Sequence, residues 1–153
     1  MKRVWQSVVC VLMIGALLLT GVGCSLGESK DPNVLGDYRV EIKDYRLAKD
    51  ADGKDLVIVK YGFTNNSEES AAFVYALTYE AFQNGIGLTE VMEESIESAD
   101  YSDADQLREI KGGTSLDVEV AYELSDTTTP VDVEVTELIS FSDKKVTKTF
   151  NIQ

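Results

Sequence analysis

Carboxylates and two cysteines are the side chains of this sequence that could do chemistry, because it contains no histidine at all. Without histidine, the chain lacks the commonest general base at neutral pH and the commonest protein ligand of zinc, copper and iron. The acidic residues are numerous, but they follow no catalytic motif, and no glycine-rich phosphate loop accompanies them. We therefore expect a protein that is not an enzyme and that uses no cofactor.

The first cluster of carboxylates surrounds Gly53, where Asp50, Asp52 and Asp55 follow one another closely. Carboxylates at this spacing around a glycine suit a hard cation such as Ca²⁺. A complete EF-hand loop also needs a ligand at its fifth position and a glutamate at its twelfth. The fifth position here is Lys54 and the twelfth is a tyrosine. We therefore interpret these residues as an Asp-Gly turn between two strands.

A denser acidic segment covers residues 90–105, and its candidate cation ligands are Asp100, Asp103 and Asp105, with Glu93, Glu94 and Glu97 nearby. Outside the cell, where millimolar affinity suffices, such a segment could bind calcium weakly. It could equally recognise a partner, because long loops on a rigid scaffold often carry function. A solvated surface loop with at most one helical turn is the plainer interpretation.

The residues before the second cysteine have the order of a secretory signal. Lys2 and Arg3 form a short positive end, residues 8–19 are almost wholly apolar, and small residues follow. The apolar stretch is shorter than the roughly 20 residues that a transmembrane helix needs. The first cysteine, Cys10, lies inside this stretch and would be removed with it.

Cys24 stands directly after the signal, and Gly21-Val22-Gly23-Cys24 resembles the bacterial lipobox. The resemblance implies cleavage between Gly23 and Cys24 and attachment of a lipid to the Cys24 thiol. Gly21 departs from the leucine that usually stands at its position. The alternatives are an ordinary secretory signal that contains a cysteine, and an uncleaved anchor.

These features divide the chain into a signal peptide over 1–23, a lipidated flexible tether over 24–35 and one domain over 36–153. The first 23 residues hold two basic residues and no acid, so the rest carries 12 basic and 27 acidic residues, a net charge of −15. Such a surface repels nucleic acids and anionic lipid headgroups. The expected partners are therefore the membrane, through the lipid anchor, and an unknown protein or small ligand, but no nucleic acid.

Alternation of apolar and polar residues with period two predicts an all-β, antiparallel sandwich of about seven or eight strands. Asn84-Gly85 predicts a tight hairpin, because both central residues of that turn need positive φ. Most of the seven tyrosines lie on the apolar register, so we expect packing from at least four of them, although some could line a sugar- or peptide-binding face. The expected strands cover 37–47, 56–64, 71–83, 86–88, 106–111, 114–124, 131–141 with a bulge, and 146–152.

The domain resembles DUF5067, a family of unknown function found in lipoproteins of Gram-positive bacteria. Phe63-Thr64-Asn65-Asn66-Ser67 and Phe82-Gln83-Asn84-Gly85 are the most specific segments of the resemblance. The family usually has a proline where Gly112 or Gly113 stands. The resemblance implies an immunoglobulin-like β-sandwich and no known activity. The other matching segments are residues 38–42, 59–62, 81, 109–113 and 131–135.

Together these observations predict a lipid-anchored protein on the extracytoplasmic face of the cell membrane, with a non-enzymatic interaction domain whose ligand is unknown. Two alternatives remain open. One is a weak Ca²⁺- or small-ligand-binding lipoprotein that uses the 90–105 loop. The other is an accessory lipoprotein in envelope assembly or secretion.

Overall fold

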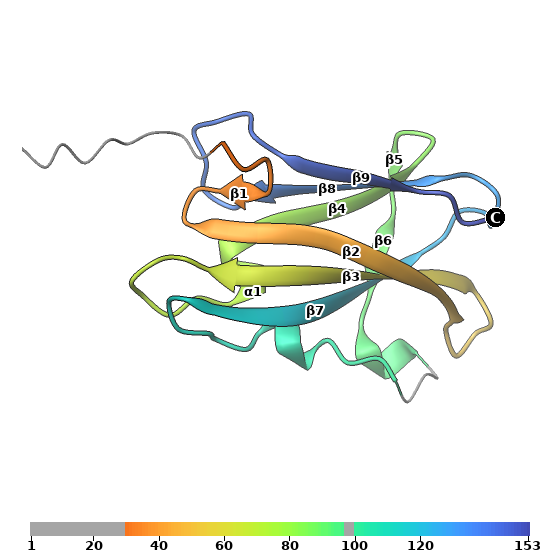
Figure 1. The fold of residues 1–153 in the computed structure, drawn as a ribbon. Helices are drawn as coiled ribbons and strands as arrows, with labels where there is room; N and C mark the ends of the chain where they lie inside the picture. The colour runs from red at the N-terminus through yellow and green to blue at the C-terminus, as the bar shows by residue number, and fades with distance from the viewer. Residues whose placement is uncertain (1–29, 97–99) are drawn as a thin grey trace, which may run out of the picture.

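The computed structural model describes residues 30–96 and 100–153, which form two antiparallel sheets packed face to face (Figure 1). One sheet has the strand order β1-β2-β3-β7-β6 and the other has the order β5-β4-β8-β9. The predicted all-β sandwich is therefore confirmed. The first sheet contains β1 (Val34–Leu35), β2 (Tyr38–Lys49), β3 (Asp55–Asn65), β6 (Thr89–Val91) and β7 (Thr114–Glu123). The second contains β4 (Leu77–Gln83), β5 (Ile86–Gly87), β8 (Val131–Glu137) and β9 (Val146–Phe150).

The strand order is that of an immunoglobulin domain. Strands β2-β3-β7-β6 correspond to strands A, B, E and D, and β4-β8-β9 correspond to C, F and G of the constant-type fold. Two short strands extend the sheets, since β1 pairs with β2 and β5 pairs with β4. The described part of the chain therefore carries the topology that the family resemblance implies.

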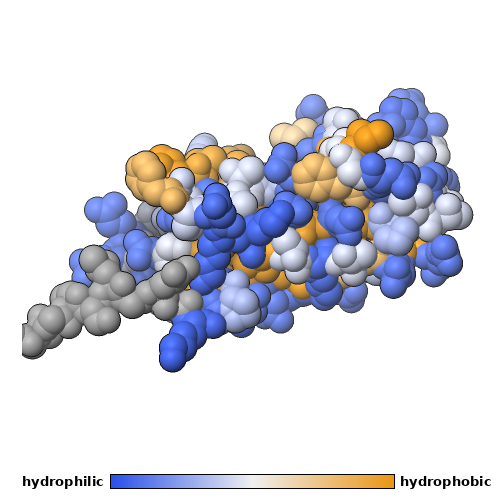
Figure 2. All heavy atoms as spheres, turned by 90° about the horizontal axis from the view of Figure 1, so that it is seen from above, coloured by the Kyte–Doolittle hydropathy of each residue, from blue (hydrophilic) through white to orange (hydrophobic). Residues whose placement is uncertain are grey.

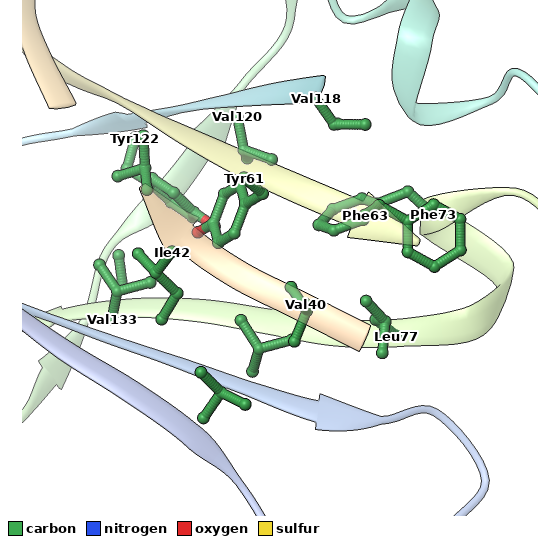
Figure 3. Packing of buried hydrophobic residues seen from close by; sticks show 14 of the residues in the cluster. Val40, Ile42, Tyr61, Phe63, Phe73, Leu77, Val118, Val120, Tyr122 and Val133 are labelled. Atoms are coloured by element: carbon green, nitrogen blue, oxygen red, sulfur yellow. The ribbon is translucent and has the colours of Figure 1, made fainter. Parts of the chain in front are cut away.

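Side chains from the facing sheets interlock in one hydrophobic core, part of which Figure 3 shows. The ring of Phe73 is stacked on Tyr79 at 4.7 Å and edge-on to Phe63 at 5.8 Å between centroids. Such pairs contribute about 0.5–1.5 kcal/mol beyond the area that they bury. Tyr61 and Tyr122 turn their hydroxyl groups toward each other in the same core. The aromatic cluster therefore joins the two sheets.

The predicted tight turn at Asn84-Gly85 is confirmed. Asn84 has φ 53° and Gly85 has φ 73°, and the turn joins β4 to β5 through the pair Gln83 and Ile86. Glycine adopts this left-handed backbone without the steric penalty that a Cβ brings, and asparagine tolerates it.

The predicted strand over 71–83 begins later than expected, because the chain first makes the helical turn α1 (Phe73–Ala76). Phe73 and Ala76 are buried at helical spacing, whereas Tyr75 is 69% exposed. The turn carries the chain from β3 in one sheet to β4 in the other. Spacing of two between Phe73 and Tyr75 was therefore misleading, since only one of them enters the core.

The predicted strand over 106–111 is wrong. The 3₁₀ turn η2 (Ala104–Gln106) lies at its start, and a single bridge joins Ile110 to Ala71. The neighbouring strand β7 already pairs with β3 on one side and with β6 on the other. On that second side β6 covers only residues 121–123, and beside the rest of β7 the side-chain amide of Gln106, rather than a backbone group, donates to the Glu119 carbonyl.

The predicted strand over 131–141 ends at Glu137. Its neighbour β4 begins at Leu77, which pairs with Glu137, so no partner strand continues beyond that point. Leu138, Ile139 and Phe141 consequently lie in the loop between β8 and β9 and are exposed.

The domain also begins earlier than residue 36. Val34 and Leu35, which we assigned to the tether, form β1, and Leu35 is only 1% exposed. Asp31 already contacts the domain, because its carboxylate accepts a hydrogen bond from Arg39 at 3.2 Å. The predicted signal peptide, Gly23 and Cys24 lie outside the described residues.

Candidate functional site

The acidic segment 90–105 lies across the edge of the larger sheet and holds to it through apolar side chains. Its 3₁₀ turn η1 (Glu93–Ser95) follows β6, and residues 97–99 lie outside the described residues. Tyr101 is 3% exposed and packs with Ile58 and Ala121, and Val91 and Ile96 pack against the same cluster. The described parts of this loop are therefore anchored, and Glu93 and Glu94 are exposed to solvent.

The three candidate cation ligands, Asp100, Asp103 and Asp105, make separate contacts. The Asp103 carboxylate accepts the backbone N–H of Glu93 at 3.0 Å, and the carboxylate of Asp105 pairs with Arg108 at 3.0 Å. The backbone carbonyl of Asp100 accepts a hydrogen bond from Arg46. Within residues 30–96 and 100–153, no three acidic or cysteine side chains converge on a position that could hold a metal ion. Glu97 lies outside the described residues.

Glu93 and Asp103 instead bind each other's backbone. Asp103 accepts from the Glu93 N–H, and the Glu93 carboxylate accepts from the Asp103 N–H at 3.3 Å and from the Ser102 hydroxyl at 2.9 Å. The arrangement is reciprocal in the manner of a helix capping box. These two acids therefore close the loop.

The carboxylates around Gly53 also serve a turn, as we interpreted them. Asp50 accepts the backbone N–H groups of Asp52 at 2.9 Å and Lys54 at 2.8 Å, and Asp55 pairs with Lys49 at 2.6 Å. This bonding is typical of an Asx turn.

Sequence reasoning missed a polar cluster beside the core, formed by Glu90, Gln106 and Tyr79. The Tyr79 hydroxyl donates to the side-chain oxygen of Gln106 at 3.1 Å, and the Gln106 amide donates to the Glu119 carbonyl. Loss of hydration raises the pKa of Glu90, against the opposing effect of a hydrogen bond from Gln106. Burial, with the Glu90 charge, raises the pKa of Tyr79 to about 12, so this phenol is neutral at pH 7. No sequence signal separates Glu90 from the other acids of its segment.

Tyr61 and Tyr122 form a second polar pair, deep in the core, with their hydroxyl oxygens 3.2 Å apart. Tyr61 is 0% exposed and Tyr122 is 2% exposed, and burial raises the pKa of both phenols above the ordinary value. The pair is therefore a neutral hydrogen bond in an apolar core. Together with Tyr101 and the partly buried Tyr38, Tyr45 and Tyr79, it confirms that at least four tyrosines pack in the core regions.

Replacing one member of this pair by phenylalanine should lower the free energy of unfolding by about 1–2 kcal/mol, because it leaves the other hydroxyl buried without its partner. The double variant Tyr61→Phe/Tyr122→Phe should cost less than the sum of the single variants, because it removes both hydroxyls. Urea unfolding of all four proteins checks this expectation. Strictly additive losses would show that the two hydroxyls do not depend on each other.

The two most specific segments of the family resemblance each contain a buried amide. Gln83 is 1% exposed, and its amide donates to the carbonyls of Asp126 and Thr129 at 3.0 and 2.8 Å. Its side-chain oxygen accepts the N–H of Ser125 at 2.7 Å. Gln83 therefore holds the loop that precedes β8, a role that the sequence alone did not reveal.

Asn65 does the same at the opposite end of the sandwich, where it is 0% exposed. Its amide donates to the carbonyls of Glu69 at 2.7 Å and Ile110 at 3.0 Å, and its oxygen accepts the N–H of Ser67 at 2.9 Å. Part of this is the turn chemistry that we expected, but the bond to Ile110 also joins a second loop.

The glycine pair at 112–113 fits this junction. A Cβ on Gly112 would collide with the Ser67 carbonyl oxygen, and Gly113 has φ 76°. Proline is locked near φ −65°, so residue 113 could not be proline in this backbone. The backbone of this chain therefore requires glycine rather than proline at position 113.

Among the described residues, the strongest exposed apolar feature is the β8–β9 loop, residues 138–145, where Leu138 is 49%, Ile139 is 78% and Phe141 is 106% exposed. The loop lies beside the start of the described domain, because the Lys144 ammonium donates to the Asp31 carbonyl at 3.2 Å. The sequence signal was the apolar run itself, which we assigned to a strand.

Comparison with known proteins agrees with this architecture. Residues 25–137 match the family described as "Domain of unknown function (DUF5067)". No curated protein matches the sequence. Within the described residues, no helix has the length and apolar character needed to cross a membrane.

Two solved structures share the fold. One is described as "a putative lipoprotein from Staphylococcus aureus"; it is 18% identical, has a TM-score of 0.56, and the match covers 78% of this chain and 90% of that one. The other is the structure of a protein from Enterococcus faecalis, also 18% identical, with a TM-score of 0.57 and coverage of 84% and 95%. At this identity the likeness establishes the fold alone.

Proposed function

Since this chain belongs to the DUF5067 family, we propose that it is a lipoprotein on the extracytoplasmic face of the cell membrane, and that its immunoglobulin-like sandwich is a non-enzymatic interaction domain. The lipid is attached to Cys24 after cleavage behind Gly23. The domain stands at the membrane surface, where its exposed faces meet a partner or ligand.

The observation that carries the proposal is the order of residues 1–24: a positive end, an apolar stretch, small residues and then a cysteine. Two acyl chains on one cysteine give stable attachment, whereas a single chain is marginal. The similar solved structure from Staphylococcus aureus bears a lipoprotein description, which supports the same assignment here.

The domain itself supports a binding role more than a catalytic one. The chain has no histidine, and the acids of the 90–105 segment that the structure describes bind backbone groups and an arginine. The hydroxyls of Tyr61 and Tyr122 bond to each other, and the Tyr79 hydroxyl bonds to Gln106. Calcium binding has no comparable support, since the candidate ligands in the described residues point to separate partners.

Replacing Cys24 by alanine should abolish processing to the lipidated form, and Cys10→Ala is the matched control. After expression of the full chain and cell fractionation, the wild type and Cys10→Ala should appear as the processed protein in the membrane fraction. Cys24→Ala should either retain its leader or leave the membrane. If all three proteins have the same size and the same location, the lipid anchor at Cys24 is ruled out.

A further inference from the structure

Three of the eight large exposed apolar side chains of the described domain lie together in one loop. Leu138, Ile139 and Phe141 lie within four residues of the β8–β9 loop, whereas the other large exposed apolar side chains occur singly along the chain. Figure 2 shows one group of hydrophobic side chains at the end of the sandwich where this loop lies in Figure 1, with others along the face and toward the opposite end. Single exposed apolar residues need no explanation, but a concentrated group marks a contact surface.

The position of the β8–β9 loop indicates which surface it contacts. It lies next to Asp31, to which Lys144 is hydrogen-bonded, and the described chain begins at Lys30. Lys30 lies only six positions after Cys24, so even a fully extended chain between them spans at most about 22 Å. By comparison, the 12 residues of β2 run for about 40 Å. A domain anchored at Cys24 therefore cannot turn its far end to the membrane while this end points away.

The size of the loop favours a lipid surface over a protein. Even if each of the three side chains buried as much as an aromatic one, about 150–250 Å², together they would offer less than the roughly 800 Å² per partner of a stable protein interface. An anchored protein needs little intrinsic affinity for the bilayer, because the tether keeps the loop at high effective concentration.

Charge does not supply this contact. The chain after residue 23 carries a net charge of −15, and Lys144 and Lys145 contact Asp31 and Glu134 within the domain. An acidic protein is repelled by anionic headgroups. Apolar side chains on the loop supply the attraction that the charge does not.

We propose that the β8–β9 loop inserts Ile139 and Phe141 into the outer part of the lipid bilayer, with Leu138 at its margin, and so holds the sandwich end-on to the membrane. This inference rests on the proposed lipid anchor at Cys24. The opposite end, which carries the 50–54 and 84–85 turns and the loop held by Gln83, then faces away from the membrane. That end is where the proposed partner would bind.

Tryptophan fluorescence tests the orientation, because the only tryptophan of the chain, Trp5, lies in the predicted leader. In a Trp5→Phe background, Phe141→Trp places a probe in the loop. Ile86→Trp places a matched probe in the β4–β5 hairpin, where Ile86 is 68% exposed at the far end. Each full-length, lipidated protein is reconstituted into phosphatidylcholine vesicles with and without brominated acyl chains.

The Phe141→Trp protein should lose most of its fluorescence to the brominated lipid and show a blue-shifted emission, and the Ile86→Trp protein should do neither. Salt should leave the result unchanged, since the contact is apolar. If the protein floats with the vesicles but the probe at 141 is no more quenched than the probe at 86, the insertion is refuted and the anchor stands. If the protein does not float with the vesicles, the anchor itself fails, and the inference falls with it.

Discussion

Replacing Asn65 by leucine should lower the free energy of unfolding by about 3 kcal/mol or more. Asn65 is 0% exposed and links three backbone groups, the Ser67 N–H and the carbonyls of Glu69 and Ile110. Leucine keeps a similar volume but can make none of these bonds. Each buried group left unsatisfied costs about 1–3 kcal/mol, and the loops over 66–70 and 107–113 lose the residue that joins them.

The neighbouring asparagine provides the control. Asn66 is exposed in the same turn, so Asn66→Leu should change the stability by no more than about 0.5 kcal/mol. Urea unfolding, followed by circular dichroism, measures both variants against the wild type. Equal midpoints for Asn65→Leu and the wild type would mean that the buried amide does not hold these loops.

Phe73→Ala should cost about 3–5 kcal/mol, the range for removing a buried phenylalanine. Phe73 is 0% exposed and its ring contacts Phe63, Tyr61 and Tyr79, so alanine leaves a cavity between the two sheets. The one-turn helix α1 that holds it has four residues and cannot compensate for the loss by itself.

Phe141→Ala is the matched control, because it makes the same substitution at the surface, where no core packing is lost. Phe141 is 106% exposed, so Phe141→Ala should leave the thermal midpoint of the domain nearly unchanged. It removes an apolar side chain from the β8–β9 loop alone. A large loss of stability from Phe141→Ala, or none from Phe73→Ala, would contradict the packing described here.

The sequence predicted the sandwich because burial on alternate sides leaves a period of two in strands such as β7. It failed where the same spacing arose for another reason. Phe73 and Tyr75 alternate in sequence, but a helical turn places one inside and the other outside. Ile110 makes one isolated bridge, and its segment contacts β7 through the side chain of Gln106 rather than through backbone pairing. Contacts between distant parts of the chain decide both cases, and local sequence patterns carry no information about those contacts.

The candidate sites divide in the same way. The lipidation site at Cys24 is recognised from the residues next to it, so it can be predicted from the sequence. The contacts of the acidic residues join distant parts of the chain, so they cannot. Glu93 and Asp103 lie ten positions apart, and their spacing does not indicate that each binds the other's backbone. The roles of Asn65 and Gln83 also emerge only when the loops that they hold are seen. Exposure of Ile139 and Phe141 depends on where β8 loses its partner strand.

The identity of the mature N-terminus tests the central claim most directly. The protein is extracted from membranes of the producing cells and digested, and the mass of its N-terminal peptide is determined. The lipoprotein account predicts a peptide that begins at Cys24 and carries a lipid on that cysteine. A peptide that begins elsewhere, or an unmodified Cys24 within a longer peptide, would contradict it.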